Sequence, residues 1–116
     1  MSNQWKGICE FDQNGYIIQG KPTWLASGEF QYFRMTREDW EPRLLQLKLA
    51  GFNTVSVYFA WNYHEVEEGV WDFSGDKDVE LFLQTAAKVG LYVVARPGPF
   101  ICNEWQCGGI PAWLTM

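Results

Sequence analysis

The sequence predicts an α/β fold in which parallel strands alternate with helices. Strand-like stretches occupy residues 24–33, 53–60 and 91–96, and apolar residues at helical spacing occupy 36–51 and 77–89 between them. Strands joined by a crossover long enough to hold a helix are parallel neighbours with right-handed connections. No internal repeat and no Pro/Gly/Ser-rich linker interrupts the chain. Because a closed (β/α)₈ barrel needs about 250 residues, we expect an incomplete barrel: its first three β/α units, preceded by a short hairpin.

The leading hairpin is expected over residues 1–22. Two short strand-like stretches, 11–12 and 16–18, flank the turn sequence 13–15, whose Asn-Gly pair supplies the positive φ angles of a tight turn. A second turn is expected at Gly20-Lys21-Pro22, after which the main fold begins.

The first main strand and the first helix follow. Polar and aromatic side chains alternate over 24–33, as in a strand. Residues 36–39 are typical of a helix start, with a hydroxyl cap and acids near the positive end of the helix dipole. Because Pro42 lacks an N–H, we expect the regular helix to begin only at Glu41 and to end at Gly51. One face of this helix is apolar and carries Trp40, Leu44 and Leu47.

The second strand shows the clearest pattern in the chain. One face of residues 53–60 carries Val55, Val57 and Phe59, and the other carries Thr54, Ser56, Tyr58 and Ala60. The next helix is expected over 77–89, with acids at its start and Gly90 after its end, and residues 91–96 form a third strand.

Composition bounds the function. The 116 residues are 47% hydrophobic and 20% charged, which is the profile of a folded soluble domain, and we expect residues 1–116 to be the N-terminal segment of one barrel domain. A net charge of −5 disfavours nucleic acid and anionic membrane surfaces as partners. With one histidine and no C-x-x-C pair, we expect neither a metal site nor a cofactor. The chain has no apolar run that could span a membrane and no hydrophobic signal core at its start, so the expected location is the cytoplasm.

The loops after the strands are the expected site, because such loops build the active site of α/β barrels. Residues 61–65 and 97–105 combine aromatic rings with carboxylates and amides. Aromatic faces suit the C–H surface of a sugar ring, and polar groups suit its hydroxyls. Carbohydrate is therefore the expected ligand class, although tryptophans are equally common as core filler.

Several motifs in these segments, in order and spacing, resemble glycoside hydrolase family 35, the family of β-galactosidases. They are Ser27 to Arg34, Gly51 to Val55, Tyr58 to Glu65, Phe73-Ser74-Gly75, Arg96 to Trp105 and Gly108 to Leu114. The resemblance covers nearly all of the chain from about Asp12 onward. It implies a retaining exo-glycosidase that removes terminal β-linked galactose through a covalent intermediate formed on one of two glutamates.

The resemblance also assigns roles to residues. Both catalytic glutamates are expected beyond residue 116, so the chain carries no catalytic residue and is expected to be inactive alone. The frame around Asn103-Glu104 matches the family's motif after the third strand, whose glutamate holds the sugar, so Glu104 is expected to bind substrate and not to act as acid/base. By the same correspondence, Tyr58 hydrogen-bonds the galactose through its hydroxyl, and Asn103 contacts the sugar with its amide or main chain.

Two departures leave alternatives open. Asn103 stands where alanine is common in animal and plant members, and Gln106-Cys107 replaces an acidic or amide residue followed by an aromatic one. Exo-β-glucosaminidase specificity within the same family is one alternative. A non-catalytic sugar-binding module is another, and a fragment that associates with itself or complements the missing remainder of the barrel is a third.

Some polar side chains have structural roles as alternatives to chemical ones. His64 could act as a base, but we expect it to fix its loop by hydrogen bonding to a neighbour such as Glu65. Arg34 and Arg96 either steady a catalytic carboxylate or form structural ion pairs with Glu29 or Glu65.

Other residues of the loops have two possible roles as well. Trp105 and Trp113 either stack on sugar or pack under the loop. Cys102 and Cys107 are expected to be reduced thiols. The acids of 65–68 are expected to form a solvated face, on which Glu65 is the ordered one.

Overall fold

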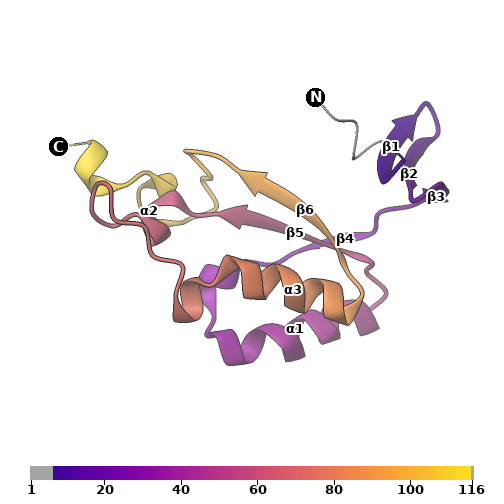
Figure 1. Cartoon of the computed structure of the whole chain (residues 1–116), viewed down its shortest axis with the longest axis horizontal. Coiled ribbons are helices and arrows are strands. Elements are labelled where there is room, and N and C mark those ends of the chain that lie inside the picture. Colours follow the sequence, from indigo (N-terminus) through magenta and orange to yellow (C-terminus); the bar gives the residue numbers. More distant parts are fainter. Residues whose placement is uncertain (1–6, 116) are drawn as a thin grey trace.

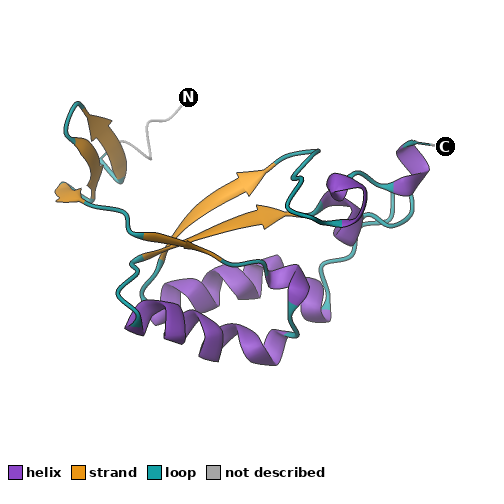
Figure 2. Ribbon diagram, turned by 180° about the vertical axis from the view of Figure 1, so that it is seen from behind, coloured by secondary structure: helices purple, strands orange, loops and turns teal. Residues whose placement is uncertain are grey.

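The computed structural model describes residues 7–115 and contains two separate sheets and the helices that connect their strands (Figure 1). An antiparallel sheet contains β1 (Cys9–Asp12), β2 (Gly15–Ile18) and β3 (Lys21–Thr23). A parallel sheet of order β4-β5-β6 contains β4 (Ser27–Glu29), β5 (Thr54–Phe59) and β6 (Tyr92–Pro97). The helices α1 (Arg37–Leu49) and α3 (Val79–Val89) connect these strands. Both helices lie side by side on one face of the parallel sheet, and its other face is open (Figure 2).

The core lies between β5 and the two long helices. Val55 and Val57 of β5 are fully buried on the helix side, as the strict alternation predicts. Trp40 and Leu44 of α1 and Phe82 of α3 are buried against them. The apolar helix faces read from the sequence are therefore the faces that build this core.

The helix α1 begins earlier than predicted. It starts at Arg37 and contains Pro42 in its interior. Thr36 precedes it, but the expected hydroxyl cap is wrong, because the Thr36 hydroxyl donates to the Asp39 carboxylate and accepts no main-chain N–H of the described helix. The prediction of a start at Glu41 is wrong, because the missing bond from Pro42 would lead to the carbonyl of Glu38, an exposed residue where water can take its place.

The strand β4 is shorter than the predicted strand 24–33. Pairing with β5 covers only Ser27–Glu29, and the chain then turns into a short 3₁₀ helix, Tyr32–Arg34. Consecutive side chains of a strand point to opposite faces, whereas Tyr32 and Phe33 are both buried and meet edge to face at 5.3 Å between ring centroids. The turn lets both rings enter the same core.

The antiparallel sheet extends the predicted hairpin by one strand. Residues 1–6 of the range 1–22 lie outside the described residues, and β1 and β2 pair as expected around the Gln13-Asn14 turn. Of the Asn-Gly pair, only Gly15 has a positive φ, at 132°. The second turn falls at Gln19-Gly20, with φ of 50° and 77°, so the prediction of a turn at 20–22 is wrong. Lys21–Thr23 forms the edge strand β3 instead, where a proline is tolerated.

The predicted second helix corresponds to α3. Asp78 caps it by accepting a hydrogen bond from the N–H of Leu81 at 2.9 Å, and Gly90 ends it in the left-handed conformation with φ of 91°. A short helix that the sequence did not predict, α2 (Trp61–His64), follows β5 directly. With the loop after β6, α2 lies at the carboxyl ends of the strands, at the end of the molecule opposite the antiparallel sheet (Figure 1). Among residues 7–115, no helix combines the length and apolarity needed to cross a bilayer.

Candidate functional site

Three charged or aromatic side chains come together on the open face of the parallel sheet. Tyr58 of β5 lies opposite Arg96 of β6 in register, and the guanidinium carbon of Arg96 sits 4.1 Å from the centre of the Tyr58 ring. Arg96 also reaches Glu29 of β4, with 3.6 Å between its Nη1 and the carboxylate Oε1. Of the alternatives left open for Arg96, the structure shows the ion pair with Glu29. Together these contacts hold the Tyr58 ring in place while leaving it at a half-buried position.

The main chain of Tyr58 is fixed by a side chain from another segment. The Gln31 carboxamide oxygen accepts the N–H of Tyr58 at 3.0 Å. Gln31 follows β4 and is buried, with 7% of its surface exposed. The sequence analysis did not single out Gln31, whose only signal was a polar residue in an otherwise aromatic stretch.

The loop after β6 has an unusual backbone. Cys102, Asn103 and Glu104 have φ of 57°, 43° and 53°, so successive residues are left-handed. Asparagine adopts this conformation readily, whereas for the other two it is uncommon. The Arg34 guanidinium donates to the main-chain carbonyl of Asn103 and so ties this loop to the 3₁₀ helix after β4. This bond gives Arg34 a partner that neither sequence alternative foresaw.

A glycine closes the same loop. The N–H of Ile101 donates to the carbonyl of Gly108 at 2.7 Å, which brings the two ends of the loop together. Gly108 has φ of 61°, and a Cβ there would lie 2.0 Å from the Phe100 ring. Glycine adopts this backbone at no steric cost, and a larger residue would also have to displace the Phe100 ring.

The sequence-predicted binders thus lie at the carboxyl ends of β5 and β6. Tyr58 and Asn103 are half-buried and are connected through Gln31, which bonds Tyr58 and lines a cavity together with Asn103. Glu104 is exposed on the loop. The sugar contacts assigned to these residues stay predictions.

His64 is held from both sides. Its Nδ1 lies 3.0 Å from the main-chain carbonyl of Asp72 and therefore carries the proton. Its Nε2, 2.6 Å from the Tyr32 hydroxyl, accepts the hydroxyl proton, and the ring stacks on Phe73 at 4.6 Å. Burial lowers the pKa of His64 and raises the pKa of Tyr32. His64 fixes its loop as expected, but Glu65 is the wrong partner, because that carboxylate points elsewhere.

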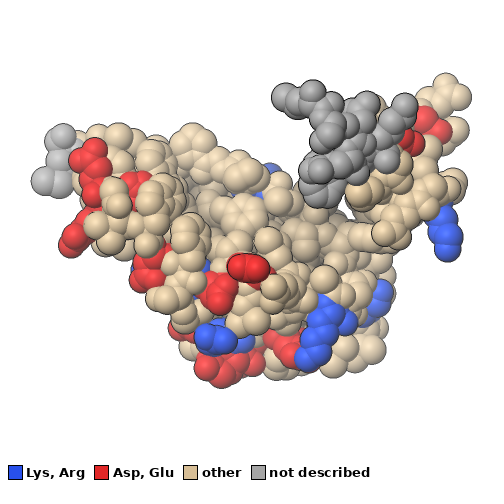
Figure 3. Space-filling view, viewed as in Figure 1, with Lys and Arg blue, Asp and Glu red and all other residues tan. Residues whose placement is uncertain are grey.

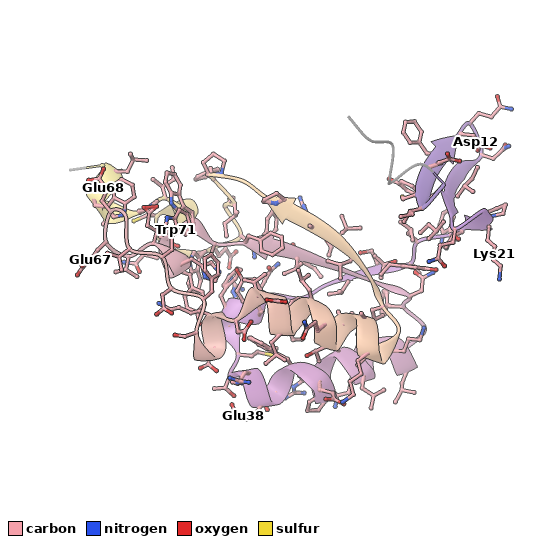
Figure 4. The ribbon with its side chains drawn as sticks, viewed as in Figure 1. Asp12, Lys21, Glu38, Glu67, Glu68 and Trp71 are labelled. Atoms are coloured by element: carbon pink, nitrogen blue, oxygen red, sulfur yellow. The ribbon has the colours of Figure 1, made fainter. Side chains whose placement is uncertain are left out.

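Glu65 organises the loop after α2. Its carboxylate accepts the indole N–H of Trp61 at 3.1 Å and the main-chain N–H of Gly69 at 3.2 Å. Glu65 is 5% exposed, whereas Glu67 and Glu68 extend from the loop into solvent (Figure 4). The expectation that Glu65 is the ordered acid is therefore confirmed, but its place on a solvated face is wrong, because of these acids only Glu67 and Glu68 are exposed.

The two loop tryptophans pack beneath the loops. The indole N–H of Trp105 donates to Asn62 at 2.8 Å, and its ring lies 4.7 Å from that of Phe33. The indole N–H of Trp113 donates to the main-chain carbonyl of Glu65 at 3.0 Å. Of the two roles considered, packing is the one that the structure bears out.

An apolar groove of about 380 Å³ opens on the helix side of the sheet, beyond α3. Its walls include Trp71 and Phe73, which are 56% and 52% exposed and whose rings are parallel, and Pro97 from the end of β6. On the face shown in Figure 3, acidic side chains gather at the loop end of the molecule. Within residues 7–115, no cluster of three His, Cys, Asp or Glu side chains could hold a metal, and Cys102 and Cys107 are free thiols.

Comparison with known proteins places the chain in a family. The model of glycosyl hydrolases family 35 matches residues 15–116. A β-galactosidase of Bos taurus is 49% identical over 90% of this chain, and an exo-β-D-glucosaminidase of Thermococcus kodakarensis is 46% identical over 93% of it. The chain spans 16% and 14% of these relatives' lengths.

The fold has a counterpart among solved structures. An exo-β-1,4-mannosidase from an Opitutaceae bacterium matches 90% of this chain and 20% of its own, with a TM-score of 0.55 and 23% sequence identity. At this identity the likeness concerns the fold alone, and it supports the α/β arrangement. The resemblance read from the loop motifs is confirmed, and the chain belongs to glycosyl hydrolases family 35.

Proposed function

We propose that this chain is part of a retaining exo-β-galactosidase, in which it forms the first three β/α units of the catalytic barrel. The observation that carries the choice of galactose is the 49% identity to the bovine β-galactosidase over 90% of the chain. The chain contributes one wall of the sugar subsite through Tyr58, Asn103 and Glu104. Both catalytic glutamates belong to the sequence beyond residue 116, about 5 Å apart as retention requires.

The fixed position of Tyr58 supports a role of this chain in sugar binding, with catalysis assigned to other segments. Its ring is held by Arg96 and its main chain by Gln31, so its hydroxyl can be aimed without the entropy cost of ordering a free side chain. A rigid wall that binds the sugar lets separate segments supply the acid and the nucleophile.

Activity assays test this proposal directly. The protein expressed from its whole reading frame is expected to release nitrophenol from nitrophenyl β-D-galactoside with retention of anomeric configuration. Residues 1–116 alone are expected to give no turnover above the blank. Turnover by the short chain, or inversion by the long one, contradicts the proposal.

A second specificity is supported by a specific relative. The identity to the Thermococcus kodakarensis exo-β-D-glucosaminidase, 46%, is close to that of the β-galactosidases. Comparing kcat/KM for nitrophenyl β-D-galactoside and nitrophenyl β-D-glucosaminide decides between the two, and a higher value for the amino sugar replaces galactose in the proposal.

The isolated chain is expected to associate, either with itself or with the remainder of the barrel. The groove with Trp71 and Phe73 supports this, as does the open sheet face, where Tyr92 and Val94 are 43% and 38% exposed. Sedimentation of residues 1–116, alone and after mixing with a separately expressed remainder, tests it. A monodisperse monomer that ignores the remainder contradicts this expectation.

A further inference from the structure

A small polar cavity of about 250 Å³ lies beside the candidate site. It opens between the end of β4, the 3₁₀ helix Tyr32–Arg34 and the loop after β6. Its wall is formed by Glu29, Phe30, Gln31, Arg34, Met35 and Asn103. Two of these side chains present hydrogen-bond donors that the described residues leave unused.

Gln31 supplies the first donor. Its carboxamide oxygen accepts the N–H of Tyr58, which fixes the orientation of the amide, because a flipped amide would set two donors against each other. The Gln31 Nε2 is then buried, and no described residue accepts a hydrogen bond from it. A buried donor without a partner is costly and rare in folded proteins.

Asn103 supplies the second donor from the opposite segment. Its Nδ2 is also buried without an acceptor among the described residues. The Arg34 guanidinium donates to the main-chain carbonyl of Asn103. This bond and the left-handed backbone of Asn103 fix the direction of its Cα–Cβ bond. The two residues with an unused amide group therefore line one cavity, and other contacts hold both of them in place.

The chemistry of the cavity selects its occupant. Two uncharged amide donors need an acceptor, whereas the half-exposed Glu29 carboxylate on the same wall, already paired with Arg96, can accept a further hydrogen bond and repels an anion. Arg34 already gives a guanidinium N–H to the Asn103 carbonyl. A hydroxyl both accepts and donates, so it suits this wall better than a carboxylate or a phosphate.

We propose that Gln31 and Asn103 together bind one hydroxyl group of the sugar, with their unused amide groups as donors. This inference rests on the proposed function and adds Gln31 to the sugar-binding residues. It makes Gln31 a bridge, because one end of its amide fixes Tyr58 and the other end contacts the ligand.

The test combines side-chain variants of the protein with sugars that lack single hydroxyl groups and measures the affinity of each combination. Methyl β-D-galactoside and its 2-, 3-, 4- and 6-deoxy analogues are titrated calorimetrically against the protein from its whole reading frame. The variants are Gln31→Glu, which keeps the acceptor for Tyr58 but loses the donor, and Asn103→Ala. Gln84→Glu is the matched control, since the exposed Gln84 amide donates to Glu80 on α3, away from the cavity. If the wild type prefers glucosaminide, that series is used.

The expected result is specific to one hydroxyl. Both variants bind the parent sugar about five- to tenfold more weakly than the wild type. For the one deoxy analogue that lacks the bound hydroxyl, variants and wild type bind with equal affinity. Gln84→Glu keeps the wild-type affinity for the parent sugar and for every analogue. If Gln31→Glu does not fold, Asn103→Ala on the loop still gives the same cycle.

The opposite results separate the inference from the proposed function. The inference is overturned if both variants bind the parent sugar and its analogues as tightly as the wild type does, or if their affinity falls equally for every analogue. Either result leaves the proposed function standing. A wild type that binds neither sugar series overturns both. A wild type that binds but does not hydrolyse the sugar overturns only the proposed function.

Discussion

The two faces of the parallel sheet have different tasks. On the helix side, Val55 and Val57 of β5 are fully buried under α1 and α3. On the open side, Tyr58 of the same strand meets the charged pair of Arg96 and Glu29, which are about half exposed. One strand therefore contributes stability through one face and candidate chemistry through the other.

This difference follows from the strand period of two. Alternate side chains of β5 must point in opposite directions, so a residue can serve the core or the site but not both. Substitutions of buried residues on the helix side should change the free energy of unfolding, and substitutions of exposed residues on the open side should leave it nearly unchanged. The four predictions below test this division, from the largest expected effect to the smallest.

Phe82→Ala should have the largest effect. Phe82 of α3 is fully buried and lies 5.5 Å from the ring centroids of both Tyr32 and Trp40, so truncation leaves a cavity in the centre of the core. The expected loss is about 3–5 kcal/mol in the free energy of unfolding, measured by urea denaturation with tryptophan fluorescence. Tyr92→Ala on the open face is the control, with a loss of under about 1 kcal/mol. Similar losses in both variants would break the comparison.

Tyr32→Phe should have an intermediate effect on the covered side. The variant keeps the ring in the core but removes the hydroxyl that donates to His64, and the buried Nε2 is then left without a donor. The expected loss is about 1–3 kcal/mol. Tyr58→Phe, which removes a hydroxyl from the open face, is the matched control and should leave the urea midpoint unchanged. A Tyr32→Phe midpoint equal to that of the wild type would show that the bond contributes nothing.

The His64 environment also predicts a pH dependence. Because burial lowers the folded-state pKa below the ordinary 6.5, the unfolded chain takes up a proton first as the pH falls. Stability is therefore constant above about pH 6.5 and falls below it, by at most about 1.4 kcal/mol per pH unit, until the folded-state pKa is passed.

The pH range of this test is chosen so that Asp72, which lies beside His64, does not contribute. Hydrogen bonds from Ser74 lower the pKa of Asp72, so its contribution is lost only as the pH falls below the ordinary value of 3.8. Urea midpoints between pH 7.5 and 5 therefore report on His64. His64→Gln should flatten this slope, and an unchanged slope would assign the effect to another group.

Much of this fold could be predicted because its signals are local. The alternation of residues 53–60 and the apolar faces of α1 and α3 specify the buried side without reference to the rest of the chain. The errors arose where tertiary contacts override a local pattern. Burial of both Tyr32 and Phe33 ends β4 early, and α1 tolerates Pro42 at a position whose hydrogen-bond acceptor would belong to the exposed residue Glu38.

The site could be predicted in its motifs but not in its connections. Tyr58, Asn103 and Glu104 were found through a resemblance of whole segments. Gln31 was missed, because its role depends on contacts with residues 27 positions and more along the chain. The bond from Arg34 to Asn103 spans 69 positions, and no spacing in the sequence indicates it.

Glu29→Gln should have the smallest effect and sharpens the comparison most. The Glu29 to Arg96 pair is half exposed and 3.6 Å long, so water and salt screen it, and its loss should cost under about 1 kcal/mol. Glu41→Gln is the matched control, because it removes an exposed pair with Lys88 on the helix side. Both urea midpoints should lie near that of the wild type at low and at high salt. A loss above about 2 kcal/mol in Glu29→Gln alone would mean that the charges of the open face help to hold β4, β5 and β6 together, and the division between the two faces would then fail.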